Sequence, residues 1–123
     1  MSAGVYDITI EQGSTFAMEV VLTSDGTLPI NLDGYLGRGQ IRHKSSDTTP
    51  VAAFVVQIID PAAGKIGISL SAAASTAIPL RGHGYSEKTE FFYDVEIYQG
   101  VDDATEVIRV LNGACFMSPE ITK

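Results

Sequence analysis

Two alternating segments near the end of the chain decide the fold: FFYDVEIY at positions 91–98 and TEVIRVL at positions 105–111. A polar break, QGVDD at 99–103, separates them. Because side chains alternate along a strand, the odd-numbered residues from Phe91 to Ile97 are expected to share one face. Period-two alternation with a polar break between the arms predicts a β-hairpin, and two such strands belong at the centre of a sheet.

Five more strands are predicted before this hairpin, from alternating or continuous apolar patterns. They cover residues 6–11, 16–22, 36–43, 51–60 and 66–70. The stretch 51–60 is the most apolar, and we expect it to be buried on both faces. Gly37 and Gly39 interrupt the strand 36–43 and indicate a bulge or a close backbone approach. A turn at Asn112-Gly113 is expected to end the hairpin, before a last short piece at 114–117.

One short helix is predicted at residues 71–78, SAAASTAI. Ser71 can cap its first turn, the alanines favour helix, and Pro79 prevents continuation. The following segment, 80–89, is polar and contains glycine, so it is expected to be a loop. Many short strands with frequent turns predict an all-β fold, with a β-sandwich or a small barrel as the options. Our prediction is a single Ig-like β-sandwich of about seven strands with one short helix, forming one domain over residues 1–123.

Composition excludes several classes of function. The 123 residues include 8 Lys and Arg against 15 Asp and Glu, a net charge of −7, which argues against nucleic-acid binding. The lone Cys115 excludes an internal disulfide and a multi-cysteine metal site. The N-terminal residues do not resemble a signal peptide, and no apolar run approaches the roughly 20 residues of a membrane helix. We therefore expect no nucleic-acid partner, no membrane association and no cofactor.

Candidate catalytic residues are few. His83 lies in the glycine-containing segment 80–89 and Cys115 alternates with apolar neighbours, so the two would form a nucleophile pair only if they met in space. A buried cysteine usually behaves as a small hydrophobic residue. Asp102-Asp103 lacks the spacing of a calcium loop, and Gly37-Arg38-Gly39 lacks the longer pattern and following helix of a phosphate loop. The sequence predicts a protein that is not an enzyme.

Two polar segments are candidates for contact with a partner. A basic cluster at Arg38, Arg42, His43 and Lys44 is either a solvated strand end or a docking patch for an acidic partner. The segment 80–89 is either a solvated surface loop or the rim of an interface, in which Tyr85 would be the anchor. The predicted interface residues are Arg81, His83, Tyr85, Lys88, Arg38 and Arg42.

Several segments are similar, in order and spacing, to small virion proteins of tailed phages. They are YDITIEQGSTF at 6–16, PINLDGY at 29–35, GQIR at 39–42, AAGKIGISLS at 62–71 and YDVEI at 93–97. Together they cover nearly the full chain, which resembles the N-terminal domain of phage baseplate upper proteins. That resemblance implies a β-sandwich module without catalytic residues, which docks to other virion proteins in several copies.

The sequence therefore predicts a non-enzymatic phage virion structural protein of the baseplate or tail, the neck, or the capsid decoration. Such a protein would be assembled in the host cytoplasm, located in the virion, and homo-oligomeric or otherwise multi-copy in the particle. The alternative is a small ligand- or carbohydrate-binding β-sandwich, which would present exposed aromatic residues around a pocket. The candidates for that role are Tyr35, Tyr85 and Tyr98.

Overall fold

The predicted hairpin forms the two longest strands of the chain. The computed structural model describes residues 4–24, 28–43, 49–78, 89–99 and 106–119. Strands β9 (Thr89–Gln99) and β10 (Glu106–Ser118) pair antiparallel along their length. Residues Phe91, Tyr93, Val95 and Ile97 are all buried, whereas the residues between them face outward. The predicted hairpin and its register on β9 are confirmed.

The second arm of the hairpin differs from the prediction in two ways. The pairing with β9 shifts between Arg109 and Leu111, so Val110 and Leu111 are consecutive and both buried. Beyond this bulge, β10 runs straight through Asn112 and Gly113 to Ser118, so the predicted break at these residues is wrong. Gly113 is needed here because a Cβ atom on it would overlap the backbone oxygen of Tyr6 in the neighbouring N-terminal segment.

Ten strands lie within the described residues, and seven of them are longer than two residues. The strands other than the hairpin are β1 (Gly4–Val5), β2 (Ile8–Glu11), β3 (Phe16–Val21), β4 (Thr23–Ser24), β5 (Leu28–Pro29), β6 (Leu36–Arg42), β7 (Ala52–Asp60) and β8 (Lys65–Leu70). The five strands predicted before the hairpin correspond to β2, β3, β6, β7 and β8.

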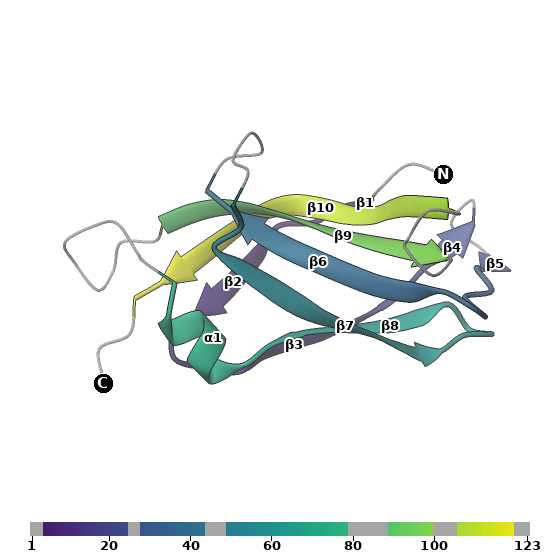
Figure 1. Cartoon of the computed structure of the whole chain (residues 1–123), viewed down its shortest axis with the longest axis horizontal. Helices are drawn as coiled ribbons and strands as arrows, with labels where there is room; N and C mark the ends of the chain where they lie inside the picture. Colours follow the sequence, from purple (N-terminus) through teal and green to yellow (C-terminus); the bar gives the residue numbers. More distant parts are fainter. Residues whose placement is uncertain (1–3, 25–27, 44–48, 79–88, 100–105, 120–123) are drawn as a thin grey trace.

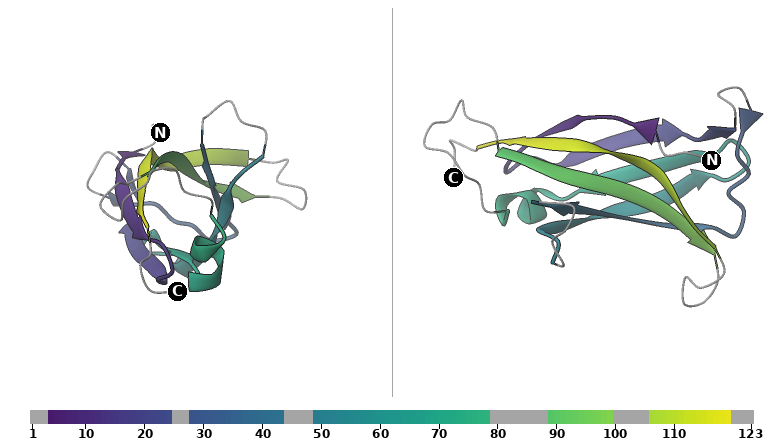
Figure 2. Two further views of the ribbon diagram at one scale, coloured as in Figure 1. Left: turned by 90° about the vertical axis from the view of Figure 1, so that its left-hand side faces the viewer. Right: turned by 90° about the horizontal axis from the view of Figure 1, so that it is seen from above.

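Eight of the strands form one curled sheet in the order β1-β10-β9-β6-β7-β8-β3, with β2 also paired to β10, and β4 and β5 form a separate two-stranded sheet. β7 connects the two layers, since residues from Ala52 to Phe54 pair with β6 and those from Val55 onward pair with β8. Figure 1 shows β6, β9 and β10 above β3, β7 and β8, and the end-on view in Figure 2 shows the strands surrounding a common interior.

This arrangement is an all-β, Ig-like sandwich. Immunoglobulin domains place their strands C, F and G side by side in one sheet and pair strands B and E in the other. Here β6, β9 and β10 lie side by side in one layer, and β3 pairs antiparallel with β8 in the other. The N-terminal strands β1 and β2 both run parallel to β10 and complete its outer edge.

The expectation that residues 51–60 are buried on both faces is wrong. Phe54 is buried, but Val55 and Ile59 on the opposite face of β7 are 56% and 46% exposed. The reason is that β7 is an antiparallel strand of a two-layer sandwich, so only one of its faces meets the core. The expected close backbone approach is found at Gly39, where a Cβ atom would lie 3.0 Å from the Asp94 backbone oxygen, whereas at Gly37 a Cβ atom would overlap the side chain of Val56 on β7.

The predicted helix, α1 (Ala72–Thr76), closes one end of the sandwich (Figure 1). The Ser71 hydroxyl caps it by accepting a hydrogen bond from the Ala74 amide, as the sequence predicts. Ser75 is fully buried and joins the helix to the turn between β2 and β3. Its hydroxyl accepts from the Gly13 amide at 2.9 Å, and its single proton has two acceptors within reach, the Ala72 carbonyl oxygen at 3.0 Å and the Ser14 carbonyl oxygen at 3.2 Å.

Candidate functional site

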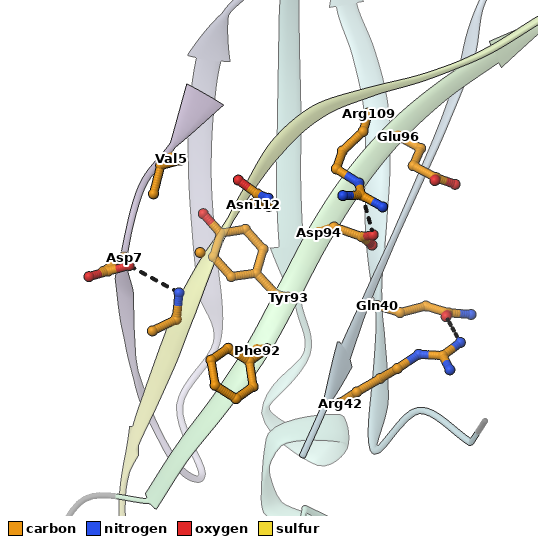
Figure 3. A pocket seen from close by; sticks show the side chains of 12 residues that line it. Val5, Asp7, Gln40, Arg42, Phe92, Tyr93, Asp94, Glu96, Arg109 and Asn112 are labelled. Carbon is orange, nitrogen blue, oxygen red and sulfur yellow. Dashed lines mark hydrogen bonds and ion pairs between the residues drawn. The ribbon is translucent and has the colours of Figure 1, made fainter. Parts of the chain in front are cut away.

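A hollow of about 660 Å³ lies on the outer face of β6, β9 and β10, and the N-terminal segment forms one of its sides. We call it the outer groove (Figure 3). Its position follows from the alternation of β9: residues facing away from the core must meet their cross-strand neighbours on the outer face. Phe92 is opposite Arg42 of β6 and Ala114 of β10, and Asp94 is opposite Gln40 and Asn112.

Ion pairs connect the three strands across this face. The Nε atom of Arg38 lies 2.9 Å from Oε1 of Glu96, and its guanidinium also lies 4.9 Å from the centre of the Tyr98 ring. The Nε atom of Arg109 lies 3.5 Å from Oδ2 of Asp94. These side chains are partly exposed, so the pairs contribute little to the free energy of unfolding. Their main effect is to orient charged groups on the outer face.

Asp94 is the carboxylate with the most perturbed environment in the outer groove. Burial raises the pKa of Asp94 above its ordinary value, and the neighbouring charge of Glu96 raises it further. The positive charges of Arg109, Arg42 and Arg38 act in the opposite direction but do not cancel the increase. The nearby positive charges therefore do not fully offset the cost of ionising the partly buried Asp94 carboxylate.

The N-terminal side of the outer groove is attached to β10 through both backbone and side chain. The Tyr6 amide donates to the Asn112 carbonyl oxygen at 2.8 Å, and the Ala114 amide donates to Oδ1 of Asp7 at 3.0 Å. The Tyr93 hydroxyl donates to the Tyr6 carbonyl oxygen. The regular parallel pairing with β10 is interrupted between β1 and β2. At this point the Asp7 carboxylate accepts the hydrogen bond of the Ala114 amide, as a backbone carbonyl does in regular pairing.

Asn112 adds a further acceptor at the floor of the outer groove. Its Oδ1 atom is buried and has no hydrogen-bond partner among the residues that the structure describes. A buried acceptor without a donor costs free energy of the order of 1–3 kcal/mol. Asn112 and the carboxylates of Asp7 and Asp94 thus place acceptor groups on the same part of the groove.

Two of the predicted interface residues lie on the outer face of β6, where Arg38 pairs with Glu96 and Nη2 of Arg42 donates to Oε1 of Gln40 at 2.6 Å. His43 does not extend this cluster, because its ring packs 4.6 Å from the ring of Phe91. The other predicted interface residues, and Lys44 of the basic cluster, lie outside the described residues; they are Arg81, His83, Tyr85, Lys88 and Lys44.

The aromatic residues proposed for a ligand pocket do not gather around the outer groove. Tyr98 lies beneath Arg38, and Tyr35 borders a second hollow of about 640 Å³ beside Leu36 and Ile59. Tyr85 lies outside the described residues. Among the described residues, the aromatic side chains that line the outer groove are Phe92, which is 43% exposed, and Tyr93, which is buried.

Sequence reasoning did not single out Phe92, Arg109, Asp7 or Asn112 as site residues. The outward face of the predicted hairpin could have identified the first two, since both alternate with core residues. Nothing in the sequence near Asp7 or Asn112 indicates that the two residues meet, because they are separated by most of the chain and approach only through the parallel pairing with β10.

Cys115 is fully buried, and this burial raises the pKa of its thiol to about 12. A nucleophilic cysteine needs a thiolate and an approach for its substrate, and Cys115 has neither at neutral pH.

No three His, Cys, Asp or Glu side chains within the described ranges are grouped so that they could hold a metal ion. The helix that the structure describes is also too short to cross a membrane.

Comparison with known proteins finds no matching family model and no matching curated protein. Among solved structures, the chain is similar to the NK cell receptor Nkp44, a triggering partner in natural cytotoxicity, with 12% identity, a TM-score of 0.37 and coverage of 98% of this chain and 100% of that one. It is also similar to a structure from work on multimeric cell-adhesive interactions of VGSC beta subunits, with 11% identity, a TM-score of 0.34 and coverage of 98% and 96%.

Proposed function

We propose that this chain is a non-enzymatic structural protein of a bacteriophage virion, present in several copies and docked to other virion proteins. The virion setting is supported by the ordered resemblance of five segments to small tailed-phage proteins. The docking role is supported by the outer groove, which combines a hollow surface, an exposed aromatic ring and charged side chains held in fixed positions. No reaction is assigned to the outer groove, and Cys115, the candidate nucleophile, is buried.

The outer groove has the features of a protein-binding surface. Interfaces usually place an apolar or aromatic anchor at the centre and polar groups at the rim. Phe92 would be the anchor, and Val5, which is 80% exposed, lies at the N-terminal side of the groove. Arg42 and Arg109 would be part of the polar rim, where charge sets orientation more than affinity.

The proposal is tested on purified particles. Antibodies raised against the recombinant chain should label intact virions, and electron microscopy of those particles should locate it at the baseplate, tail, neck or head. Absence of the chain from purified particles, while it is present in the infected lysate, would exclude a structural role in the virion.

A matched pair of variants tests which surface docks. Phe92→Ser in the outer groove should lower the occupancy of the protein on particles, whereas Val55→Ser should not. Val55 is a suitable control because it is also apolar and exposed, at 56%, but lies on β7 in the part that pairs with β8. Replacing residues 81–88 by a short Gly-Ser connection tests the predicted loop interface in the same assay.

The alternative function is binding of a small ligand or carbohydrate, which is favoured by the volume of the outer groove. Ligand pockets typically enclose about 300–1,000 Å³, and the groove falls within this range. Titration of the isolated protein with a panel of neutral sugars, followed by amide chemical shifts, distinguishes the two functions. Saturable shifts of groove residues with one sugar would favour the alternative.

A further inference from the structure

The carboxylates of the outer groove differ in their ion pairing. Three of them line it, those of Asp7, Asp94 and Glu96, and three guanidinium groups lie in the groove or at its edge, those of Arg42, Arg109 and Arg38. Asp94 pairs with Arg109, and Glu96 pairs with Arg38 at the edge of the groove. Asp7 is exposed and makes no ion pair with any residue in the described part of the chain. Its charge is therefore available to a partner.

The two sides of the outer groove differ in chemistry. Asp7 lies on the β2 side and Arg42 on the β6 side, with β10 and β9 between them in the strand order. Figure 3 shows these two side chains on either side of Phe92. One side thus presents a carboxylate and the other presents hydrogen-bond donors, so a ligand that crosses the groove would be bound in one direction.

From this arrangement we infer that the outer groove binds an extended segment of a partner protein that places a lysine or arginine side chain against Asp7. The segment would cross Phe92, and its backbone carbonyl groups or an acidic side chain would meet Arg42. This inference rests on the proposed function, because it takes the partner to be a protein. It goes further by stating which kind of side chain the docking segment of that partner carries.

Charge supports a cationic residue rather than an anionic one. The chain carries a net charge of −7, so its long-range field attracts positive groups. Within the groove the Asp7 carboxylate makes no ion pair with a described residue, and the raised pKa of Asp94 indicates that a further positive charge nearby would be favourable. Exposed ion pairs of this kind fix the orientation and increase the association rate more than they increase the affinity.

A protein segment fits the outer groove better than a free cation. A metal ion would need several ligands around one point, and no such cluster of His, Cys, Asp and Glu exists among the described residues. The exposed side chains of Phe92 and Val5 would remain uncovered by an inorganic ion. An extended segment would cover them and still reach the polar groups on both sides.

The test uses the isolated, isotopically labelled full chain and two synthetic peptides, acetyl-Gly-Ser-Lys-Ser-Gly-amide and its glutamate counterpart. The lysine peptide should cause saturable amide shifts confined to the outer groove, around Asp7, Phe92 and Ala114. The glutamate peptide should bind at least about threefold more weakly, which is the size of effect typical of an exposed ion pair. Equal binding of both peptides, or shifts spread over other surfaces, would overturn the inference.

A pair of variants separates the effect of the Asp7 charge on peptide binding from effects on folding and on net charge. Asp7→Asn keeps an oxygen that can accept from the Ala114 amide but removes the charge, and it should weaken binding of the lysine peptide about threefold or more. Glu19→Gln makes the same change in net charge on β3, in the other layer, and should leave the affinity unchanged. If both variants weaken binding equally, the effect is one of net charge and the inference fails. Asp94→Asn provides a second groove variant if Asp7→Asn lowers the melting temperature.

The peptide experiment also separates the inference from the proposed function. It needs no virion, so confined lysine-peptide binding would support the groove chemistry even if the chain were absent from purified particles. Conversely, a chain found in virions whose groove does not distinguish the peptides would retain the proposed function and lose this inference.

Discussion

At the residue scale, Tyr93 and Cys115 place two ionisable groups in the interior of the central hairpin. Burial is the main cause that raises the pKa of Tyr93 from 10.0 to about 12, and the neighbouring Cys115, Asp7 and Tyr6 raise it further. Burial likewise raises the pKa of Cys115 from 9.0 to about 12. Both groups are therefore neutral in the folded protein well beyond the pH at which they ionise in the unfolded chain.

These shifts predict a loss of stability at alkaline pH. Because the folded-state values are raised, the contribution to the free energy of unfolding is complete below pH 9 and is lost progressively between about pH 9 and pH 12. Urea unfolding at pH 7.5 and pH 10.5 measures this loss. Cys115→Ala should show a smaller loss than the parent over the same interval, and an identical loss in both proteins would contradict the assignment.

Val95 tests the register of the hairpin. It is completely buried on β9, so Val95→Asp would place an unpaired charge in the core, which costs several kcal/mol of a typical total of about 5–15 kcal/mol. The isolated domain should be unfolded or nearly so in a thermal melt. Val107→Asp, at a position 44% exposed on β10, should stay within about 1 kcal/mol of the parent. Similar melting of the two variants would show that Val95 is not in the core.

At the scale of elements, the attachment of the N-terminal segment to β10 depends on a glycine. A Cβ atom at Gly113 would overlap the Tyr6 backbone oxygen, whereas one at Gly4 would meet Leu111 Cδ1 at an ordinary distance of 3.7 Å. We expect Gly113→Ala to lower the free energy of unfolding by about 1–3 kcal/mol and Gly4→Ala to have little effect. Amide hydrogen exchange should increase in β1 and β2 of Gly113→Ala. Unchanged exchange there would mean that the strand adjusts without loosening.

The short helix depends on Ser75 in a comparable way. Its buried hydroxyl accepts from the Gly13 amide, so Ser75→Ala would leave that amide without its partner. The expected cost is about 1–3 kcal/mol. Thr76→Ala is the matched control, because the Thr76 hydroxyl is exposed and bonds within α1 to the Ala72 carbonyl oxygen at 2.9 Å. Chemical denaturation of both variants should separate them, and equal midpoints would show that the helix is not anchored through Ser75.

At the scale of the whole molecule, the two-layer sandwich predicts a spectrum dominated by strand. The helix within the described residues has five residues, so far-ultraviolet circular dichroism should give less than about a fifth helix. A helix-dominated spectrum would contradict the architecture. The same measurement at increasing temperature provides the reference for every variant above.

Predictions from the sequence succeeded where the signal was local and failed where the structure depends on contacts between distant segments. Strong alternation located β9, β3 and β8, and a serine followed by alanines located α1, because these signals are local and need only neighbouring residues. The interpretation of 51–60 as buried on both faces was wrong, because the number of layers that cover a strand is not a local property. The break expected at Asn112-Gly113 was also wrong, since Gly113 serves close packing rather than a turn.

The sequence by itself determined an all-β domain, its central hairpin and the inward face of that hairpin, because alternation of apolar and polar residues specifies which side of a strand meets the core. Only the tertiary structure decided the outer groove. Asp7 and Asn112 are far apart in the chain and meet through the parallel pairing of the N-terminal segment with β10, and Arg42 reaches the same surface through the pairing of β6 with β9. The physical reason is that strand pairing between distant segments depends on long-range packing, which leaves no periodic signal in the residues that it brings together.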